Sequence, residues 1–161
     1  MKKILAVILA RSGSKGLKNK NIKKLGNKPL VSWTIDEAKK SKKIDMIILS
    51  TDSIKIAKIG KKKKIQVPFL RPKNLSGDKS PSVDAVEHSI NFLEKEGKKF
   101  DYVILLEPTS PFRDFGDIDN SIKKLLKTKA NSLVSVCKTD TMNPLFLFKK
   151  KKRIFSSLKK N

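Results

Sequence analysis

A glycine-rich polar stretch follows the first apolar run of the chain and has the composition of a phosphate-binding loop. Gly13 and Gly16 let the backbone approach a ligand closely, and Ser14 adds a hydroxyl. Arg11 and Lys15 add two positive charges, so the set suits a nucleoside triphosphate. The spacing is neither G-x-x-x-x-G-K-[ST] nor G-x-G-x-x-G, and an ordinary flexible basic turn is the alternative interpretation.

Three further polar residues, Asp52, Arg71 and Glu107, also come directly after apolar runs. Because the carboxyl ends of parallel strands meet at one edge of a sheet, we expect them to face one cleft together with the glycine-rich loop. Asp52 fits a helix N-cap as well as a metal ligand, and Arg71 could simply close a strand end. His88, on an expected helix, fits a packed or surface residue better than a catalytic base.

The elements that must position these residues alternate between strands and helices. Short apolar runs predict strands, the first one buried on both faces, and apolar residues at helical spacing predict the helices between them. This alternation indicates βαβ units, so the fold class is α/β, a three-layer α/β/α arrangement with a mainly parallel sheet. The predicted strands are 3–9, 46–50, 65–70, 102–106 and 132–137, and the predicted helices are 29–41, 53–63, 82–95 and 118–127, the third with Ser82 as its N-cap.

Composition limits the class of protein further. The 161 residues include 38 Lys and Arg against 15 Asp and Glu, a net charge of +23. Only four of the basic residues are arginines and the charges are dispersed, so we expect no specific nucleic-acid partner. The longest apolar run, residues 4–10, is too short to cross a bilayer and fits a signal peptide poorly. A single cysteine, Cys137, is compatible with a reducing cytoplasm.

Four stretches of the sequence form an ordered signature. They are Leu9-Ala10-Arg11-Ser12-Gly13-Ser14-Lys15-Gly16, continued by Lys20-Asn21-Ile22, Lys28-Pro29-Leu30 and Trp33-Thr34-Ile35; Ser50-Thr51-Asp52; Phe69-Leu70-Arg71-Pro72; and Leu105-Leu106-Glu107-Pro108-Thr109-Ser110-Pro111. Together they resemble the acylneuraminate cytidylyltransferases, the CMP-sialic acid synthetase family, over residues 3–137. The resemblance implies a Rossmann-like fold of the nucleotide-diphospho-sugar transferase type.

The resemblance also implies a reaction. CTP and a nine-carbon nonulosonic acid, such as a sialic acid, would be the substrates, CMP would be transferred to the anomeric hydroxyl, and Mg²⁺ would assist. Arg11 and Lys15 would be the catalytic residues, and with Ser14 they would hold the triphosphate. Asn21 and Arg71 would help to bind the nucleotide. Glu107 would lie between the cytidine and sugar pockets, with Ser110 nearby.

The sequence departs from the family pattern at three points. Lys18 stands where a proline is common, and Glu107 stands where many members carry glutamine. The family's metal-binding Asp-Ile-Asp segment has no match after Cys137. Asp117-Ile118-Asp119 has the same letters, but it lies at a predicted helix start, so no metal ligand is assigned.

We therefore expect residues 1–161 to form a single nucleotidyltransferase domain that is incomplete at its C-terminus, with a basic tail at 144–161. The family resemblance suggests a homodimer, although the segment that forms it is largely missing. Three alternatives stay open: a non-catalytic remnant that binds CTP, a basic nucleic-acid-binding module, and an enzyme for an eight-carbon sugar acid.

Overall fold

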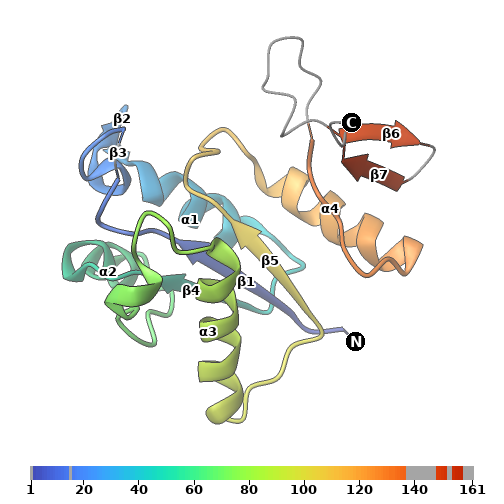
Figure 1. The fold of residues 1–161 in the computed structure, drawn as a ribbon, viewed down its shortest axis with the longest axis horizontal. Coiled ribbons are helices and arrows are strands. Elements are labelled where there is room, and N and C mark those ends of the chain that lie inside the picture. The colour runs from blue at the N-terminus through green and yellow to red at the C-terminus, as the bar shows by residue number, and fades with distance from the viewer. Residues whose placement is uncertain (1, 15, 137–147, 152–153, 158–161) are drawn as a thin grey trace. The chain divides into compact units, whose positions relative to one another are not determined.

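The structure is a computed structural model that describes residues 2–14, 16–136, 148–151 and 154–157 (Figure 1). The chain divides into two compact units, Met1–Lys129 and Ala130–Asn161. The first unit contains a parallel sheet with its helices. In the second, β6 (Phe148–Lys151) and β7 (Ile154–Ser157) form an antiparallel hairpin. The sequence did not predict this hairpin, because its lysine run shows no alternation of apolar and polar residues.

The sheet of the first unit contains β1 (Ile4–Leu9), β4 (Met46–Ser50) and β5 (Tyr102–Leu106). All three strands are parallel and their order is β4-β1-β5. The predicted strand 65–70 lies beside β4 but forms only two isolated bridges, one to Ile48 in β4 and one to Thr51 just after it. Pro68 lies between those bridges, and a proline has no N–H with which to continue a ladder.

Helices cover both faces of this sheet, as the predicted α/β class requires. On one face, α1 (Leu30–Lys40), α2 (Ile54–Lys62) and α4 (Phe115–Thr128) pack against one set of β1 side chains, which includes Ala6 and Ile8. On the other face, α3 (Ser82–Lys95) packs against Leu5 and Val7. All four of these β1 side chains are fully buried, which confirms that the first strand is covered on both sides.

The predicted N-cap of α3 and the predicted start of α4 were wrong. The N-cap of α3 is Pro81, which makes no side-chain cap hydrogen bond, and Ser82 is the first helical residue. α4 begins three residues before its predicted start, because Asp114 and Asp117 form a capping box. Of the Asp-Ile-Asp letters, Asp117 therefore caps this helix, and the nearly buried Asp119 accepts hydrogen bonds from the loop after α1.

The predicted strand 132–137 was also wrong in its described part. Residues 132–136 form no strand, and Val134 and Val136 are exposed. The stretch is rich in apolar residues, but no described strand pairs with it, and a strand needs such a partner for its backbone hydrogen bonds. Cys137 lies outside the described residues.

Shorter elements shape the loop between β1 and α1. A 3-10 turn, η1 (Lys20–Ile22), is followed by the two-stranded hairpin β2 (Lys24–Leu25) and β3 (Lys28–Pro29). Gly26 adopts a φ of 63° at the tip of this hairpin, a conformation that glycine takes without strain. In the part of the chain that the structure describes, no helix has the length and apolarity needed to span a bilayer.

Candidate active site

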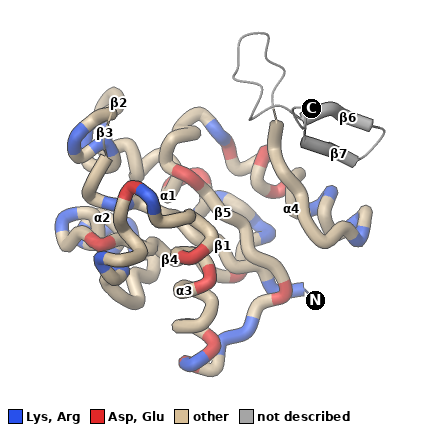
Figure 2. The backbone as a smooth tube through the Cα atoms, in the orientation of Figure 1, with Lys and Arg blue, Asp and Glu red and all other residues tan. Residues whose placement is uncertain are grey.

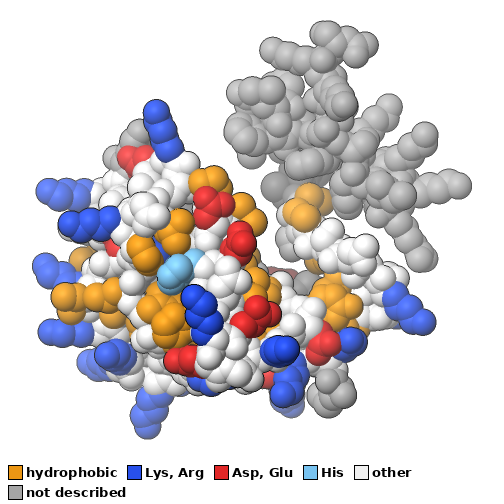
Figure 3. All heavy atoms as spheres, turned by 60° about the horizontal axis from the view of Figure 1, so that its bottom comes forward, with side chains coloured by type: hydrophobic (Ala, Val, Ile, Leu, Met, Phe, Trp, Pro, Cys, Tyr) orange, Lys and Arg blue, Asp and Glu red, His pale blue; other side chains and the backbone are white. Residues whose placement is uncertain are grey.

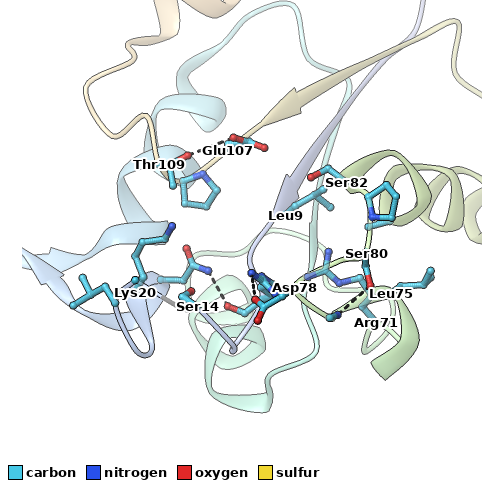
Figure 4. Close-up of a pocket in the computed structure, with 18 residues that line it drawn as sticks. Leu9, Ser14, Lys20, Arg71, Leu75, Asp78, Ser80, Ser82, Glu107 and Thr109 are labelled. Carbon is cyan, nitrogen blue, oxygen red and sulfur yellow. Dashed lines mark hydrogen bonds and ion pairs between the residues drawn. The ribbon is translucent and has the colours of Figure 1, made fainter. Parts of the chain in front are cut away.

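A cleft of about 580 Å³ opens at the carboxyl edge of the sheet (Figure 4). The strand order reverses at β1, and α/β sheets bind their ligands at such a reversal point. The volume lies within the range of about 300–1,000 Å³ that is usual for small-molecule sites. Its polar lining comes from three segments: Arg11, Ser14, Lys20 and Asn21 after β1; Arg71, Asp78, Ser80 and Ser82 after residues 66–70; and Glu107 and Thr109 after β5.

Arg11 is held over the cleft by contacts with residues 76–78. Its Nη2 lies 2.6 Å from Oδ1 of Asp78, and its Nη1 donates to the backbone oxygen of Ser76 at 3.4 Å. The side chains of the ion pair are 31% and 35% exposed, so water competes for both partners. A more strongly charged anion in the cleft can therefore replace Asp78 as the partner of Arg11.

Arg71 is 5% exposed, which does not fit the interpretation as an exposed strand-end residue. Its Nε donates to Oγ of Ser76 at 3.2 Å, and its backbone N–H donates to the carbonyl of Thr51 at 2.8 Å. Burial lowers the pKa of Arg71, the nearby Asp52 carboxylate opposes this, and the positive charge of Arg11 adds to it. An arginine stays protonated under these conditions, so the cleft holds a buried positive charge.

Ser76 therefore contacts both arginines, through its carbonyl to Arg11 and through its hydroxyl to Arg71. The turn that contains it is closed locally, since Oγ of Ser80 accepts from the backbone N–H of Gly77 and donates to the carbonyl of Asn74. Sequence analysis did not single out residues 76–80. Their glycine and serines after a predicted strand end were the available signal.

Asp52 and Asn21 both hold the loop that follows β1. The carboxylate of Asp52 accepts from the backbone N–H of Ser12 at 2.7 Å and from its hydroxyl at 2.6 Å. The N-cap of α2 is Ser53, so the N-cap interpretation of Asp52 was wrong. Asn21 is 5% exposed, and its Nδ2 donates to the carbonyl of Arg11 at 2.9 Å.

The remaining predicted residues fall in three groups. Ser14 and Glu107 line the cleft, and Figure 4 shows Glu107 and Thr109 across the cleft from Arg71. Glu107 is exposed, and the hydroxyl of Thr109 donates to it at 3.4 Å. Ser110 is not among the residues that line the cleft, although its N–H donates to the carbonyl of Glu107. Lys15 lies outside the described residues.

His88 is not among the residues that line the cleft. Its ring meets that of Phe69 edge to face, with the ring centres 4.6 Å apart, and Figure 3 shows the histidine surrounded by hydrophobic side chains. Burial lowers the pKa of His88, and the positive charges of Arg71 and Lys95 lower it further. These contacts agree with the packed-residue interpretation.

The described residues do not by themselves provide a magnesium site. Among those lining the cleft, the carboxylates are Asp78, which pairs with Arg11, and Glu107, from a different segment. No described group of three or more His, Cys, Asp or Glu side chains is arranged to hold a metal ion. We therefore assign no reaction step to a metal ion held by the described residues.

Three relatives with similar names each match more than four fifths of this chain. An N-acylneuraminate cytidylyltransferase of Escherichia coli O18:K1:H7 is 38% identical over 140 residues, which are 86% of this chain and 32% of that protein. A CMP-N,N'-diacetyllegionaminic acid synthase of Legionella pneumophila is 40% identical, over 83% of this chain and 57% of the relative. A pseudaminic acid cytidylyltransferase of Campylobacter jejuni is 34% identical, over 81% and 56%.

Solved structures share the fold. A CMP:2-keto-3-deoxy-manno-octonic acid synthetase complexed with CTP gives a TM-score of 0.66 at 18% identity, covering 80% of this chain and 49% of that one. A 4-diphosphocytidyl-2C-methyl-D-erythritol synthase gives 0.62 at 15% identity, covering 97% and 67%. Both have an arrangement of sheet and helices similar to that of this chain, which confirms the predicted fold type.

The chain spans between about a third and three fifths of the length of these curated relatives. A family model described as cytidylyltransferase matches residues 5–157, nearly the whole chain. The ordered signature, the fold and the relatives therefore agree, and this chain belongs to the cytidylyltransferase family.

Proposed function

We propose that this chain carries the CTP-binding part of an enzyme that transfers CMP from CTP to the anomeric hydroxyl of a nonulosonic acid and releases pyrophosphate. One observation supports this most: Arg11 and Arg71, from two different segments, converge through Ser76 on one cleft at the reversal point of the sheet. Two arginines beside a glycine-rich loop provide positive charge that attracts a triphosphate.

In the proposed reaction, the anomeric oxygen of the sugar forms a bond to the α-phosphorus of CTP. The bond from that phosphorus to the oxygen that leads to the β-phosphate breaks, pyrophosphate leaves, and the hydroxyl proton goes to solvent. Such a transfer asks the protein mainly to align the reacting groups and to neutralise charge. Arg11 and Lys15 would stabilise the leaving phosphates, Ser14 would hold the triphosphate, and Arg71 would help to fix the nucleotide.

Magnesium is part of the proposal as the ion that accompanies the triphosphate. Mg²⁺ usually keeps several water ligands and binds through substrate phosphates with one or two carboxylates. It would lower the negative charge that the attacking oxygen meets.

We also propose a cytoplasmic location, where CTP is available, and a homodimer, which light scattering of the purified chain tests.

The acceptor class follows from the relatives, whose names refer to N-acylneuraminate, diacetyllegionaminic acid and pseudaminic acid. These matches reach 34–40% identity, whereas the structure of the enzyme for an octonic acid matches at 18% and supports the fold alone. Glu107, at the wall of the cleft, would lie between the cytidine and the sugar acid, with Ser110 beside it.

Calorimetric titration of the purified chain with CTP and Mg²⁺ tests the nucleotide site, with ATP, GTP and UTP as competitors for specificity. We expect CTP to bind best and Arg11→Ala to weaken that binding strongly. Lys98→Ala is the matched control, because Lys98 forms a similar half-exposed ion pair, 2.8 Å from Glu96, but does not line the cleft.

Equal binding of all four nucleotides, or equal effects of the two substitutions, would contradict the proposal and favour a general polyanion-binding surface. Figure 2 shows Lys and Arg spread over many elements, so the salt dependence of binding must be measured in parallel. Release of pyrophosphate with N-acetylneuraminic acid as acceptor then separates transfer from binding. CTP binding without pyrophosphate release would favour the non-catalytic alternative.

A further inference from the structure

One peptide unit of the loop after β1 is held at both of its polar atoms by side chains. The carbonyl of Arg11 accepts from Nδ2 of Asn21 at 2.9 Å. The N–H of the same peptide unit, which belongs to Ser12, donates to Oδ1 of Asp52 at 2.7 Å, and the Ser12 hydroxyl donates to Oδ2 at 2.6 Å. Two hydrogen bonds therefore fix the plane and direction of the peptide unit next to the Arg11 side chain, and the third holds the adjacent Ser12 side chain.

Both side chains that form this clamp stand on well-anchored elements. Asp52 follows β4, which pairs with β1 up to Leu9 and Ser50, and the N–H of Ala10 extends that ladder to the carbonyl of Ser50. Asn21 lies in η1 and is buried. The clamp thus ties the polar loop to the carboxyl edge of the sheet at Ser12 and at Arg11, which lines the cleft.

We propose that Asp52 is a positioning residue that acts through the Arg11–Ser12 peptide unit, so that the Arg11 side chain faces the triphosphate. The proposal rests on the proposed function, because its consequence is measured as nucleotide binding. Asp52 itself is not among the residues that line the cleft, whereas Arg11 is. Loss of the clamp leaves the arginine present but misdirected.

The sign of the effect separates this role from a purely electrostatic one. A carboxylate close to the cleft repels a triphosphate, so neutralising it strengthens binding if charge is all that matters. If Asp52 instead holds the loop, Asp52→Asn replaces two charge-assisted hydrogen bonds with weaker neutral ones, one of them with the amide N–H₂ donating to the Ser12 hydroxyl, and the clamp loosens. The clamp therefore predicts weaker binding from a substitution that makes the protein more positive.

The experiment compares Asp52→Asn with Asp101→Asn. Asp101 is a matched control, because it also accepts a backbone N–H, from Lys3 at 2.7 Å, and a side-chain donor, Lys2 at 2.7 Å, at the start of β1 rather than at its end. We expect Asp52→Asn to weaken CTP binding by about ten- to a hundredfold, the usual cost of misplacing a binding group. Asp101→Asn should change it less than about twofold, the spread for distant sites.

A double-substitution cycle distinguishes positioning from general destabilisation. If Asp52 acts through Arg11, the double variant Arg11→Ala, Asp52→Asn binds CTP no more weakly than Arg11→Ala alone. Additive losses, or tighter binding by Asp52→Asn, would overturn the proposal. A loss that disappears when Mg²⁺ is chelated would identify Asp52 as a metal ligand and would overturn it too.

The rate at which the Ser12 amide hydrogen exchanges with solvent, measured by NMR, tests the clamp without CTP. We expect slow exchange in the wild type and Asp101→Asn and fast exchange in Asp52→Asn, and thermal unfolding confirms that each variant is folded. If Asp52→Asn does not fold, Ser12→Ala removes one of the bonds and should weaken CTP binding in the same direction. If the Ser12 amide exchanges slowly in the wild type but the wild type does not bind CTP, the proposed function is refuted. If exchange becomes fast in Asp52→Asn while the affinity for CTP is unchanged, only the positioning role is refuted.

Discussion

Replacing Asp78 with asparagine removes the carboxylate that pairs with Arg11 and keeps the size of the side chain. In the structure, Nη2 of Arg11 and Oδ1 of Asp78 are 2.6 Å apart, in a pair whose members are each about one third exposed. The proposed triphosphate needs the same guanidinium. Asp78 therefore competes with the ligand for Arg11, and Asp78→Asn should bind CTP more tightly than the wild type.

Two contributions set the size of this effect. Breaking a surface ion pair costs about 0.2–1 kcal/mol, and the variant no longer has to break it. Asp78 also lines the cleft, and the repulsion between two like charges about 4 Å apart in water is about 1 kcal/mol. Together these give about 1–2 kcal/mol, or roughly a five- to thirtyfold lower Kd for CTP.

Calorimetric titration of both proteins at one moderate salt concentration measures this difference. Glu96→Gln is the control, because it removes the carboxylate of the Lys98–Glu96 pair, and neither residue lines the cleft. It should leave the Kd almost unchanged. Weaker binding by Asp78→Asn would refute the reasoning, because it would mean that Asp78 holds Arg11 in its binding position instead of competing for it.

Two other perturbations test the packing around the site. Burial, followed by nearby positive charges, lowers the pKa of His88 below its ordinary value of 6.5, so the folded state loses stability as the pH falls from about 6.5 to that lower pKa. An NMR titration of this single histidine should give a midpoint below 6.5, and His88→Gln should reduce the loss of stability in urea unfolding; a midpoint at or above 6.5 would contradict the assignment. Gly60→Ala would place a methyl group 2.7 Å from Cδ2 of the buried Leu49. We expect this substitution to lower the free energy of unfolding by about 1–2 kcal/mol in urea denaturation. A stabilised variant would show that α2 packs more loosely against the sheet than the structure indicates.

Much of the fold could be predicted because short apolar runs and apolar residues at helical spacing leave a clear trace in the sequence. The apolar runs 46–50 and 102–106 correspond to β4 and β5 residue for residue, and helical spacing gave α3 with its observed bounds. The failures share a cause as well. Residues 132–136 carry the apolar pattern of a strand, but the pattern says nothing about whether a partner strand lies beside them.

The candidate site was predictable where strand ends carried unusual residues. Arg11, Arg71 and Glu107 do line one cleft, as expected from parallel strands that end at one edge. The contacts between segments could not be predicted, because they depend on which loop lies over which. Asp52 was interpreted as a cap or a ligand, since a sequence shows its neighbour Ser53 but not the Ser12 amide that it binds forty residues away.

The central claim is that CTP occupies the cleft at the reversal point of the sheet. Mapping the backbone amide shifts of the ¹⁵N-labelled chain during CTP titration tests it directly. We expect the largest changes on residues 11–14, 71–80 and 107–109, which surround the cleft, and much smaller changes in Arg11→Ala at the same CTP concentration. Changes centred on the lysines of α2, or no change at all, would contradict it.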